Sequence, residues 1–330
     1  MKHLSILVPQ GSVIIDTIIG SYNLFQLANN FRSVKGAEHE AQFQIDLVAQ
    51  EKQPLKFNGL FEIQPTRSIQ EVDKTDLIII PGFVGNMKKQ LEANSSLADW
   101  IRDQRIRNNA DIASLCRGAF LLADTGLMNG KACATHWLTH DTFRNMFPEV
   151  ELLPEKVISD ENGIYSSGGA YSFLNLLLYL IEKFYGRETA IWCSKISEID
   201  FDRVDQNQFT IFSGQKDHSD SEIKDIQLYL EENYSDKISI EALASRVSTS
   251  SRNFVRRFKK ATHNTPIEYL QRLRIEAAKK KLESTTLQIQ EVMFDVGYQD
   301  DKSFRTLFKR IAGLSPIEYR NKYNPEMALV

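Results

Sequence analysis

The N-terminal part of the chain alternates short apolar runs with amphipathic stretches. Apolar runs at residues 4–8, 43–48, 77–80 and 112–115 are typical of buried strands. Segments with helical periodicity lie near residues 17–30, 87–107 and 117–125, and another helix continues through 187–199. This alternation predicts a mostly parallel sheet with helices on both faces, and ligands of such sheets bind at the carboxyl ends of the strands.

The C-terminal part contains only helical patterns, and it repeats itself after fifty residues. Residues 251–260 (SRNFVRRFKK) match residues 301–310 (DKSFRTLFKR), and the Pro-Ile-Glu-Tyr run at 266–269 returns at 316–319. A match that continues in register without a gap implies one supersecondary unit used twice.

Each copy consists of two short helices joined by a turn. In the first copy, residues 240–247 form an amphipathic helix with Ser239 as predicted N-cap, and the hydroxyls of residues 248–250 can cap a second helix in which Phe254 and Phe258 share a face. The second copy has a helix that begins near residue 289 and another over about 301–311. Gly297 stands between them, where a helix that ends and reverses usually requires positive φ.

This pattern describes two helix-turn-helix units, at about 239–261 and 289–311. The second helix of each unit carries exposed basic and polar residues and would enter the major groove of DNA. A helical hairpin with a solvated basic face is the alternative for one copy alone, and the tandem repeat opposes it. Residues 266–283 between the copies predict a helix of about 27 Å, close to the roughly 34 Å rise of one DNA turn.

The second copy also carries a family signature. Residues 297–320 (GYQDDKSFRTLFKRIAGLSPIEYR) resemble the AraC/XylS-type DNA-binding domain, and the resemblance extends over roughly residues 220–322. It implies a pair of helix-turn-helix units joined by a long helix. The first copy departs mildly, with Asn264-Thr265 where the second has Leu314-Ser315.

The charge distribution agrees with DNA binding although the net charge is only -3. From Arg246 to the end there are seventeen Lys and Arg against nine Asp and Glu, a balance of +8, which leaves -11 for residues 1–245. A basic block on an acidic body is typical of phosphate binding with salt-dependent affinity.

Length and composition bound the class of protein. The 330 residues suggest two domains, and 42% hydrophobic content suffices for two cores. The apolar stretch at residues 4–8 is too short for a signal peptide, and no run approaches the length of a membrane span. Cys116, Cys133 and Cys193 show no disulfide spacing. We expect a cytoplasmic protein, nucleoid-associated when bound to DNA, with no membrane partner.

Cys116 lies where a predicted strand turns abruptly into a helix, in the run Ser114-Leu115-Cys116-Arg117-Gly118. The arrangement is similar to a nucleophile elbow, in which the helix N-terminus would lower the pKa of the thiol. The alternative is a small apolar residue buried at the end of a strand.

Three further runs carry a second resemblance: Ile80-Pro81-Gly82-Phe83, Ala134-Thr135-His136-Trp137 and residues 166–170 (SSGGA). They resemble the PfpI-like branch of the class I glutamine-amidotransferase-like superfamily, which implies a flavodoxin-like α/β parallel-sheet sandwich. With the all-α C-terminal part, the chain resembles GlxA-type AraC-family regulators over nearly its whole length. In enzymes of the superfamily a carboxylate approaches the cysteine, and Asp16 matches that position.

The same region also argues against an enzyme. Protease-like members have His directly after the cysteine, whereas Arg117 stands here and cannot act as a general base. His136 is the alternative base, but a histidine that is hydrogen-bonded within the fold beside Trp137 is the favoured interpretation. Cys133, His136, His140 and Asp141 have ligand-like spacing, but no further ligand pair accompanies them, so we predict no metal and no cofactor.

The resulting expectation is a bacterial-type, sequence-specific transcription regulator. Residues 1–199 would form a PfpI-like domain that senses a small molecule, 200–219 a linker, and 220–330 the DNA-binding domain. The partners are duplex promoter DNA, an unknown effector, a homodimer partner as one option, and RNA polymerase if the protein is an activator. The alternatives are a cysteine-dependent hydrolase or hydratase with a DNA-binding appendage, or a thiol-based oxidant sensor.

We predict that the effector pocket and the DNA interface use separate sets of residues. The pocket set is Asp16, Gly82, Phe83, Cys116, Arg117, His136 and Gly169. The DNA set is Ser250, Arg252, Asn253, Arg256, Arg257, Lys260, Lys302, Ser303, Arg305, Lys309 and Arg310, with Lys259 as a further phosphate contact.

Overall fold

A computed structural model describes residues 1–34, 42–201 and 205–324. The chain divides into two compact units, Met1–Gln206 and Asn207–Val330, called here the α/β unit and the helical unit. The boundary falls inside the predicted linker of residues 200–219. No described helix has both the length and the apolar content that a membrane span requires.

The α/β unit is built on a seven-stranded sheet that is parallel except at one edge. The strand order is β10 (Ile158–Asp160), β11 (Ile164–Ser167), β7 (Asp111–Ser114), β6 (Leu77–Ile80), β1 (Lys2–Leu7), β2 (Phe43–Ala49) and β5 (Arg67–Ser68), with β10 antiparallel. Two small sheets accompany it: the antiparallel pair β3 (Leu55–Phe57) and β4 (Phe61–Ile63), and the parallel pair β8 (Ala132–Cys133) and β9 (Glu151–Leu152).

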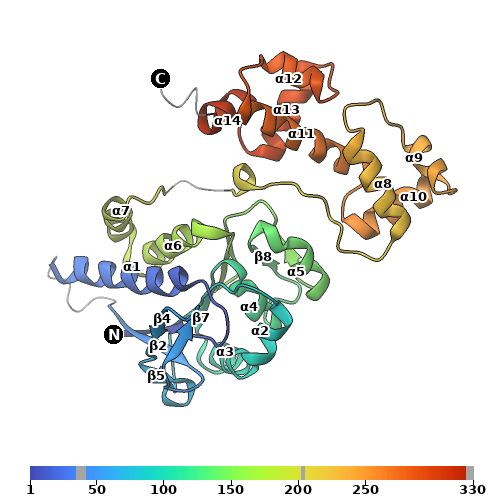
Figure 1. Ribbon diagram of the computed structural model, residues 1–330. Helices are drawn as coiled ribbons and strands as arrows, with labels where there is room; N and C mark the ends of the chain where they lie inside the picture. The colour runs from blue at the N-terminus through green and yellow to red at the C-terminus, as the bar shows by residue number, and fades with distance from the viewer. Residues whose placement is uncertain (35–41, 202–204, 325–330) are drawn as a thin grey trace. The chain divides into compact units, whose positions relative to one another are not determined.

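Helices cover both faces of this sheet, as the ribbon views show (Figure 1). One layer contains α1 (Ile15–Val34), α6 (Phe173–Tyr185) and α7 (Arg187–Ile196), which pack against one another. The other layer contains α2 (Met87–Ala93), α3 (Ser95–Asn108) and α4 (Ala119–Asp124), and α5 (His140–Met146) follows β8. The predicted flavodoxin-like sandwich is confirmed.

Two details of the sequence prediction needed correction. The single helix expected over 87–107 is divided into α2 and α3 at Asn94, whose buried side chain donates to the carbonyls of Gln10 and Gln90 and accepts from the N–H of Gln10. The strands β10 and β11 were missed, because their Ser-rich sequence does not form an apolar run.

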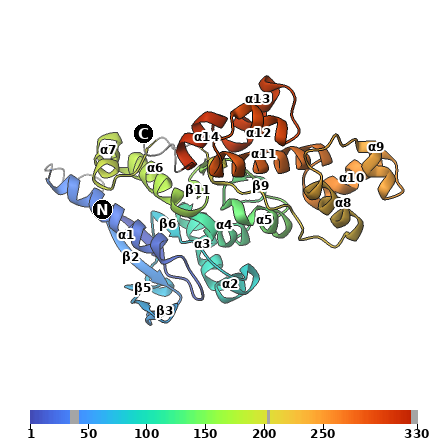
Figure 2. The same ribbon diagram turned by 45° about the horizontal axis from the view of Figure 1, so that its top comes forward.

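The helical unit places two helix pairs at opposite ends of a long helix (Figure 2). It contains α8 (Ser221–Glu232), the pair α9 (Ile240–Arg246) and α10 (Ser251–Thr262), the long helix α11 (Pro266–Ser284), the pair α12 (Ile289–Asp295) and α13 (Asp301–Ala312), and α14 (Pro316–Tyr323). Both predicted helix-turn-helix units and the connecting helix are therefore confirmed.

The sequence repeat is also a structural repeat. Phe258 packs edge-on against Tyr269 with ring centroids 5.4 Å apart, and Phe308 packs in the same way against Tyr319 at 5.6 Å. Ser250 and Asp300 are the N-caps of α10 and α13, and capping boxes begin α11 and α14. Each copy thus has its own hydrophobic core, joined by α11.

The two turns differ in length and in chemistry. Residues 247–250 separate α9 from α10, whereas residues 296–300 separate α12 from α13, one residue more. Gly297 has φ +85°, as predicted, and a Cβ there would overlap the carbonyl oxygen of Ser235. In the first copy Ser248 adopts the left-handed conformation at φ 50°.

Candidate effector pocket and nucleic-acid interface

Cys116 occupies a strained position directly after β7. Its φ of 53° lies in the left-handed region, which non-glycine residues rarely adopt. Its N–H donates to Ser167 Oγ at 3.2 Å, and its carbonyl accepts from Thr135 Oγ1 at 3.0 Å. A Cβ on Gly118 would lie 2.6 Å from the carbonyl oxygens of Ile80 and Pro81. The predicted elbow and the need for Gly118 are both confirmed.

The environment of the Cys116 thiol contradicts the expected activation. Its side chain is completely buried, and this burial raises the pKa of the thiol above its ordinary value. Backbone N–H groups of Ala170 and Arg117 and the Arg117 charge act in the opposite direction but do not outweigh burial. The backbone N–H groups thus lower the pKa as predicted, but the expected net lowering was wrong, because desolvation of a buried thiolate costs more.

The loop after β6 brings Gly82 against the elbow. A Cβ on Gly82 would lie 3.3 Å from Cys116 Cβ and 3.0 Å from Ile14 Cδ1, so these side chains would have to shift by a few tenths of an ångström to admit one. Its carbonyl accepts from the N–H of Ile14, and its N–H donates to Thr17 Oγ1 at 3.1 Å. The loop after β1 and the loop after β6 are therefore held together beside the thiol.

His136 lies against Gly169 at the same edge of the sheet. A Cβ on Gly169 would reach within 2.5 Å of the imidazole ring. Nδ1 accepts from the N–H of Leu138 at 3.1 Å, so the neutral ring carries its proton on Nε2. Burial, with a contribution from the Arg117 charge, lowers the His136 pKa to about 4. Because Nδ1 is already an acceptor, this ring is poorly suited to act as a general base.

Gln206 binds the backbone beside His136 and Gly169, and the sequence did not indicate this role. Its Oε1 accepts from the N–H of Gly169 at 3.2 Å, and its Nε2 donates to the carbonyl of Thr135 at 3.1 Å. Its side chain is buried, with 2% of the residue surface exposed. Gly169 and Thr135 are 37 and 71 residues from Gln206 in the sequence, so no local pattern could reveal that Gln206 binds them.

Two predicted pocket residues have contacts that the sequence did not indicate. Asp16 is exposed and accepts a hydrogen bond from Tyr171 Oη at 3.1 Å, so the carboxylate implied to approach the cysteine is engaged by a tyrosine. Phe83 is fully buried in the hydrophobic core, and its backbone bridges to Val13. Phe83 therefore supports the loop after β6 from the hydrophobic core. Gly82, Cys116, Arg117, His136 and Gly169 are the residues brought together.

The spacing of Cys133, His136 and His140 does not place them on one helical face. Cys133 belongs to β8, His136 precedes a 3₁₀ turn, and His140 begins α5. Burial raises the Cys133 pKa to about 12, and the thiol donates to the carbonyl of Ala134. Among the residues with described positions, no group of three His, Cys, Asp or Glu could hold a metal ion.

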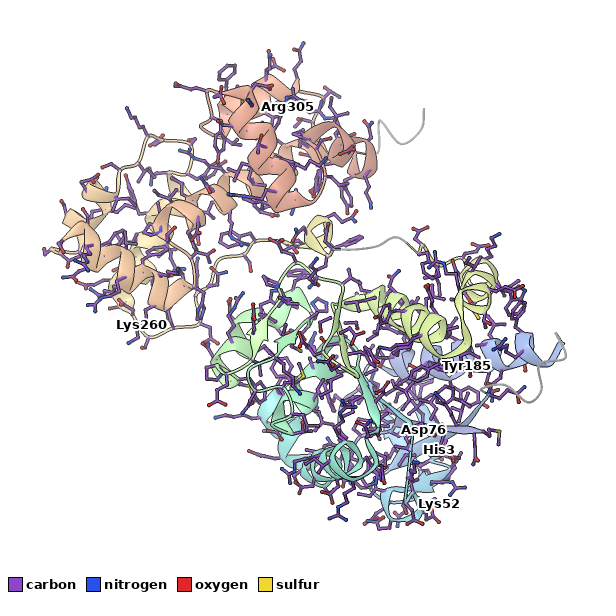
Figure 3. All side chains as sticks on the ribbon, turned by 180° about the vertical axis from the view of Figure 1, so that it is seen from behind. His3, Lys52, Asp76, Tyr185, Lys260 and Arg305 are labelled. Carbon is purple, nitrogen blue, oxygen red and sulfur yellow. The ribbon has the colours of Figure 1, made fainter. Side chains whose placement is uncertain are left out.

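The predicted DNA contacts gather on the recognition helices α10 and α13. Figure 3 labels Lys260 of α10 and Arg305 of α13 on their respective helices. The exposed members of the predicted set are Ser250, Arg252, Asn253, Arg256, Lys260, Lys302, Ser303, Lys309 and Arg310, and the neighbouring Lys259 is exposed as well. Their apolar neighbours face the cores, so each of the two helices has an exposed polar face.

Arg257 differs from its neighbours because carboxylates hold it. Its Nε and one terminal nitrogen donate to the two carboxylate oxygens of Asp220 at 2.6 and 2.7 Å, and its other terminal nitrogen lies 2.6 Å from Glu222 Oε2. Arg257 was expected to contact a phosphate, but its guanidinium instead joins α10 to the start of α8 through these ion pairs. The equivalent position in the second copy is Leu307, which packs in the core.

Arg305 also has an acidic neighbour. Its Nε donates to both carboxylate oxygens of Asp301, one turn earlier in α13, at 2.8 Å. Asp300 precedes this pair as the N-cap. The first turn of α13 is thus more acidic than that of α10, which begins with Ser251 and Arg252.

Residues 207–216, called here the connecting segment, bond to both halves of the helical unit. Gln208 accepts from Lys322 Nζ, which follows the second helix pair, while Gln215 Oε1 accepts from Asn264 at 3.1 Å, beside the first. In between, Phe212 packs edge-on against Tyr269 at 5.1 Å.

A buried ion pair on α11 anchors the centre of the connecting segment. Lys279 Nζ lies 2.9 Å from Glu276 Oε2 and donates to the carbonyl of Thr210 at 2.5 Å. Glu276 Oε2 accepts from the N–H of Phe212 at 3.2 Å.

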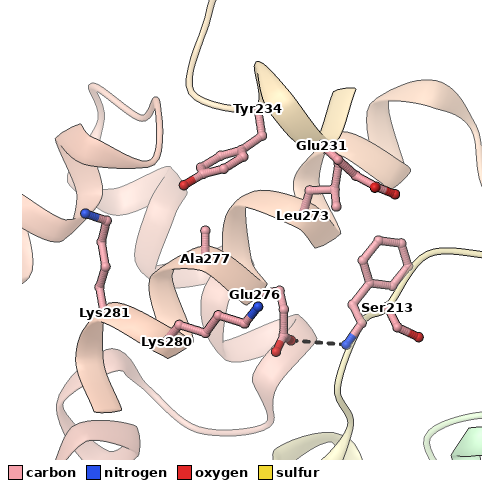
Figure 4. A pocket seen from close by; sticks show the side chains of 9 residues that line it. Ser213, Glu231, Tyr234, Leu273, Glu276, Ala277, Lys280 and Lys281 are labelled. Carbon is pink, nitrogen blue, oxygen red and sulfur yellow. Dashed lines mark hydrogen bonds between the residues drawn. The ribbon is translucent and has the colours of Figure 1, made fainter. Parts of the chain in front are cut away.

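A cavity of about 420 Å³ opens between the connecting segment, the end of α8 and α11 (Figure 4). Its walls include Phe212, Glu231, Tyr234, Glu276 and Lys280. None of them belongs to the predicted effector pocket.

Two family models match the chain. Residues 13–183 match the DJ-1/PfpI family, and residues 243–322 match a helix-turn-helix domain.

Known proteins resemble the chain over different lengths. The chain is 25% identical to the transcriptional regulator GbdR of Pseudomonas aeruginosa over 78% of this chain and 70% of GbdR. It is 28% identical to an isonitrile hydratase of Pseudomonas putida over 44% of this chain and 62% of the hydratase. A crystal structure from Vibrio parahaemolyticus, described as a candidate transcriptional regulator, covers 59% of this chain and 98% of its own, with 26% identity and a TM-score of 0.53.

Proposed function

The chain belongs to the DJ-1/PfpI family, and we propose that it is a sequence-specific DNA-binding transcription regulator of the GlxA type. Its AraC-type helix-turn-helix domain would bind promoter DNA, and its α/β unit would sense a small molecule. The observation that carries the proposal is the duplicated helix-turn-helix, in which each recognition helix has its own core and an exposed basic face. Similarity to GbdR supports the same conclusion.

The spacing of the two units fits DNA. Helix α11 has 19 residues, about 28 Å at roughly 1.5 Å per residue, against about 34 Å for one turn of DNA. One monomer would therefore place α10 and α13 in successive major grooves on one side of the duplex. Arg252, Asn253, Arg256, Lys302 and Ser303 are the proposed base-reading residues, and Lys259, Lys260, Lys309 and Arg310 the proposed phosphate contacts.

The effector would bind beside Cys116, at the carboxyl ends of the strands. The proposed pocket consists of Gly82, Cys116, Arg117, His136 and Gly169. The connecting segment would transmit the occupied state to the helix pairs, because it bonds to both halves of the helical unit. Two copies of the chain would act together on DNA, in the cytoplasm at the nucleoid, and RNA polymerase would be a partner in activation.

The test is a selection of random duplexes by the purified protein at moderate salt, with and without a pool of small metabolites. The proposal expects a motif that spans two adjacent major grooves and a change of binding with one metabolite fraction. Binding without sequence preference in both arms would refute the tandem-reader model.

Substitutions on the recognition helices separate base reading from phosphate binding. Arg252→Ala or Arg256→Ala should relax sequence preference, at about 1–3 kcal/mol per lost base contact. Lys309→Ala should weaken binding to all sequences and reduce the salt slope by about one. Equal, sequence-independent losses for all three would contradict the groove-reading role.

A cysteine-dependent enzyme is the second candidate, and the similarity to isonitrile hydratase favours it. It requires that Cys116→Ser abolish turnover while DNA binding persists. The buried thiol with its raised pKa and the occupied Nδ1 of His136 support the sensor instead. The same burial opposes direct oxidation of Cys116, because oxidants react with accessible thiolates.

A further inference from the structure

Arg117 lacks the anionic partner that other arginines of the α/β unit have. Most described arginines of this unit pair with a carboxylate, namely Arg67, Arg102, Arg105, Arg107, Arg144 and Arg187. For Arg117 no side-chain ion pair or hydrogen bond exists among the described residues, and its buried Nε has no acceptor. An unpaired buried donor costs about 1–3 kcal/mol, so an acceptor is expected to complete this site.

The groups around the Arg117 guanidinium do not neutralise its charge. It lies close enough to the Cys116 thiol and the His136 ring to act on both electrostatically, and both are uncharged near neutral pH. Asp16, the acidic residue expected at this edge, accepts from Tyr171 and forms no ion pair with Arg117 among the described residues. His136 carries a proton on Nε2, which is a donor. Arg117 and His136 therefore offer a cation and a hydrogen-bond donor, and among the described residues no carboxylate forms an ion pair with the guanidinium.

We propose that the effector carries a carboxylate or a comparable anionic group and that Arg117 binds this group. The inference rests on the proposed sensing function of the α/β unit. A guanidinium suits the role because its planar fork can donate two parallel hydrogen bonds to a carboxylate.

The test compares acids with their own amides. The melting temperature of the full-length protein is measured by tryptophan fluorescence with each proteinogenic amino acid and with acetate, succinate, benzoate and pyruvate. Each acid that stabilises is then compared calorimetrically with its amide. The expected result is that at least one acid binds and its neutral amide does not. Arg117→Met should bind that acid about ten- to a hundredfold more weakly, and Arg117→Lys should fall between them.

The control variant is Arg102→Met, which removes a surface arginine paired with Asp99 and should leave acid binding unchanged. If no acid stabilises the protein, if acid and amide bind equally, or if Arg117→Met retains full affinity, the proposal is wrong. Failure of the regulator function would look different, because the unliganded wild-type protein would then show no sequence preference on DNA. Arg102→Met without ligand should bind DNA like the wild type.

Discussion

The ion pair between Lys279 and Glu276 should determine the stability of the helical unit. Its side chains are only 5% and 12% exposed, and Nζ and Oε2 lie 2.9 Å apart. Both partners also bond the connecting segment, at Thr210 and Phe212. Removing one partner therefore leaves a desolvated charge with a backbone group as its remaining partner.

The magnitude follows from this burial. Lys279→Met should reduce the free energy of unfolding by about 3–5 kcal/mol, since a buried carboxylate loses its counter-ion. Glu276→Gln should cost a similar amount, because its amide keeps an acceptor for Phe212 but leaves the ammonium unpaired. The double variant Glu276→Leu/Lys279→Met should cost far less than the sum, because no buried charge remains.

The assay uses the distribution of tryptophan. All three tryptophans, Trp100, Trp137 and Trp192, belong to the α/β unit, so their fluorescence during urea unfolding reports that unit, while far-UV circular dichroism reports both. Lys279→Met should shift the dichroism transition and leave the fluorescence transition in place. Lys280→Met, an exposed neighbour, should change stability by less than about 0.5 kcal/mol. A loss below about 1 kcal/mol for Lys279→Met would refute the reasoning.

Three further predictions address the recognition helix, a turn and the pocket. Lys260→Met should lower the salt slope of DNA binding by about one, whereas Arg257→Met should barely change it because carboxylates hold that guanidinium. Filter binding at several salt concentrations would show equal slopes if this is wrong. Gly297→Ala should destabilise the helical unit by about 1–3 kcal/mol, because φ is positive there and a Cβ would overlap the backbone. Gly130→Ala should destabilise the protein less, because φ is also positive but the space around it is open. Equal shifts of the dichroism midpoint for the two variants would contradict the overlap. The folded-state pKa of His136, about 4, lies below the ordinary 6.5, so the unfolded chain takes up a proton first as the pH falls. The free energy of unfolding should therefore decrease as pH decreases from 6.5 towards 4. His136→Gln should flatten this dependence in fluorescence-monitored urea unfolding, and an unchanged pH profile would count against the prediction.

Local patterns in the sequence predicted most of the elements. The spacing of Phe254 and Phe258, repeated at 304 and 308, identified both recognition helices, and Ser239 and Gly297 marked where helices begin and end. These signals work because helix periodicity and capping act within a few residues. The break at Asn94 was not predictable in this way, because its partner Gln10 is 84 residues away.

The sequence by itself determined the two-part organisation, the tandem helix-turn-helix, the elbow at Cys116 and the division of charge between an acidic and a basic part. The tertiary structure alone decided the chemical state of the important side chains. It buried the Cys116 thiol, held Arg257 with carboxylates from another helix, and left Arg117 without an anion. The physical reason is range: hydrophobic periodicity and capping are properties of neighbouring residues, whereas desolvation and ion pairing depend on groups that folding brings together from distant parts of the chain.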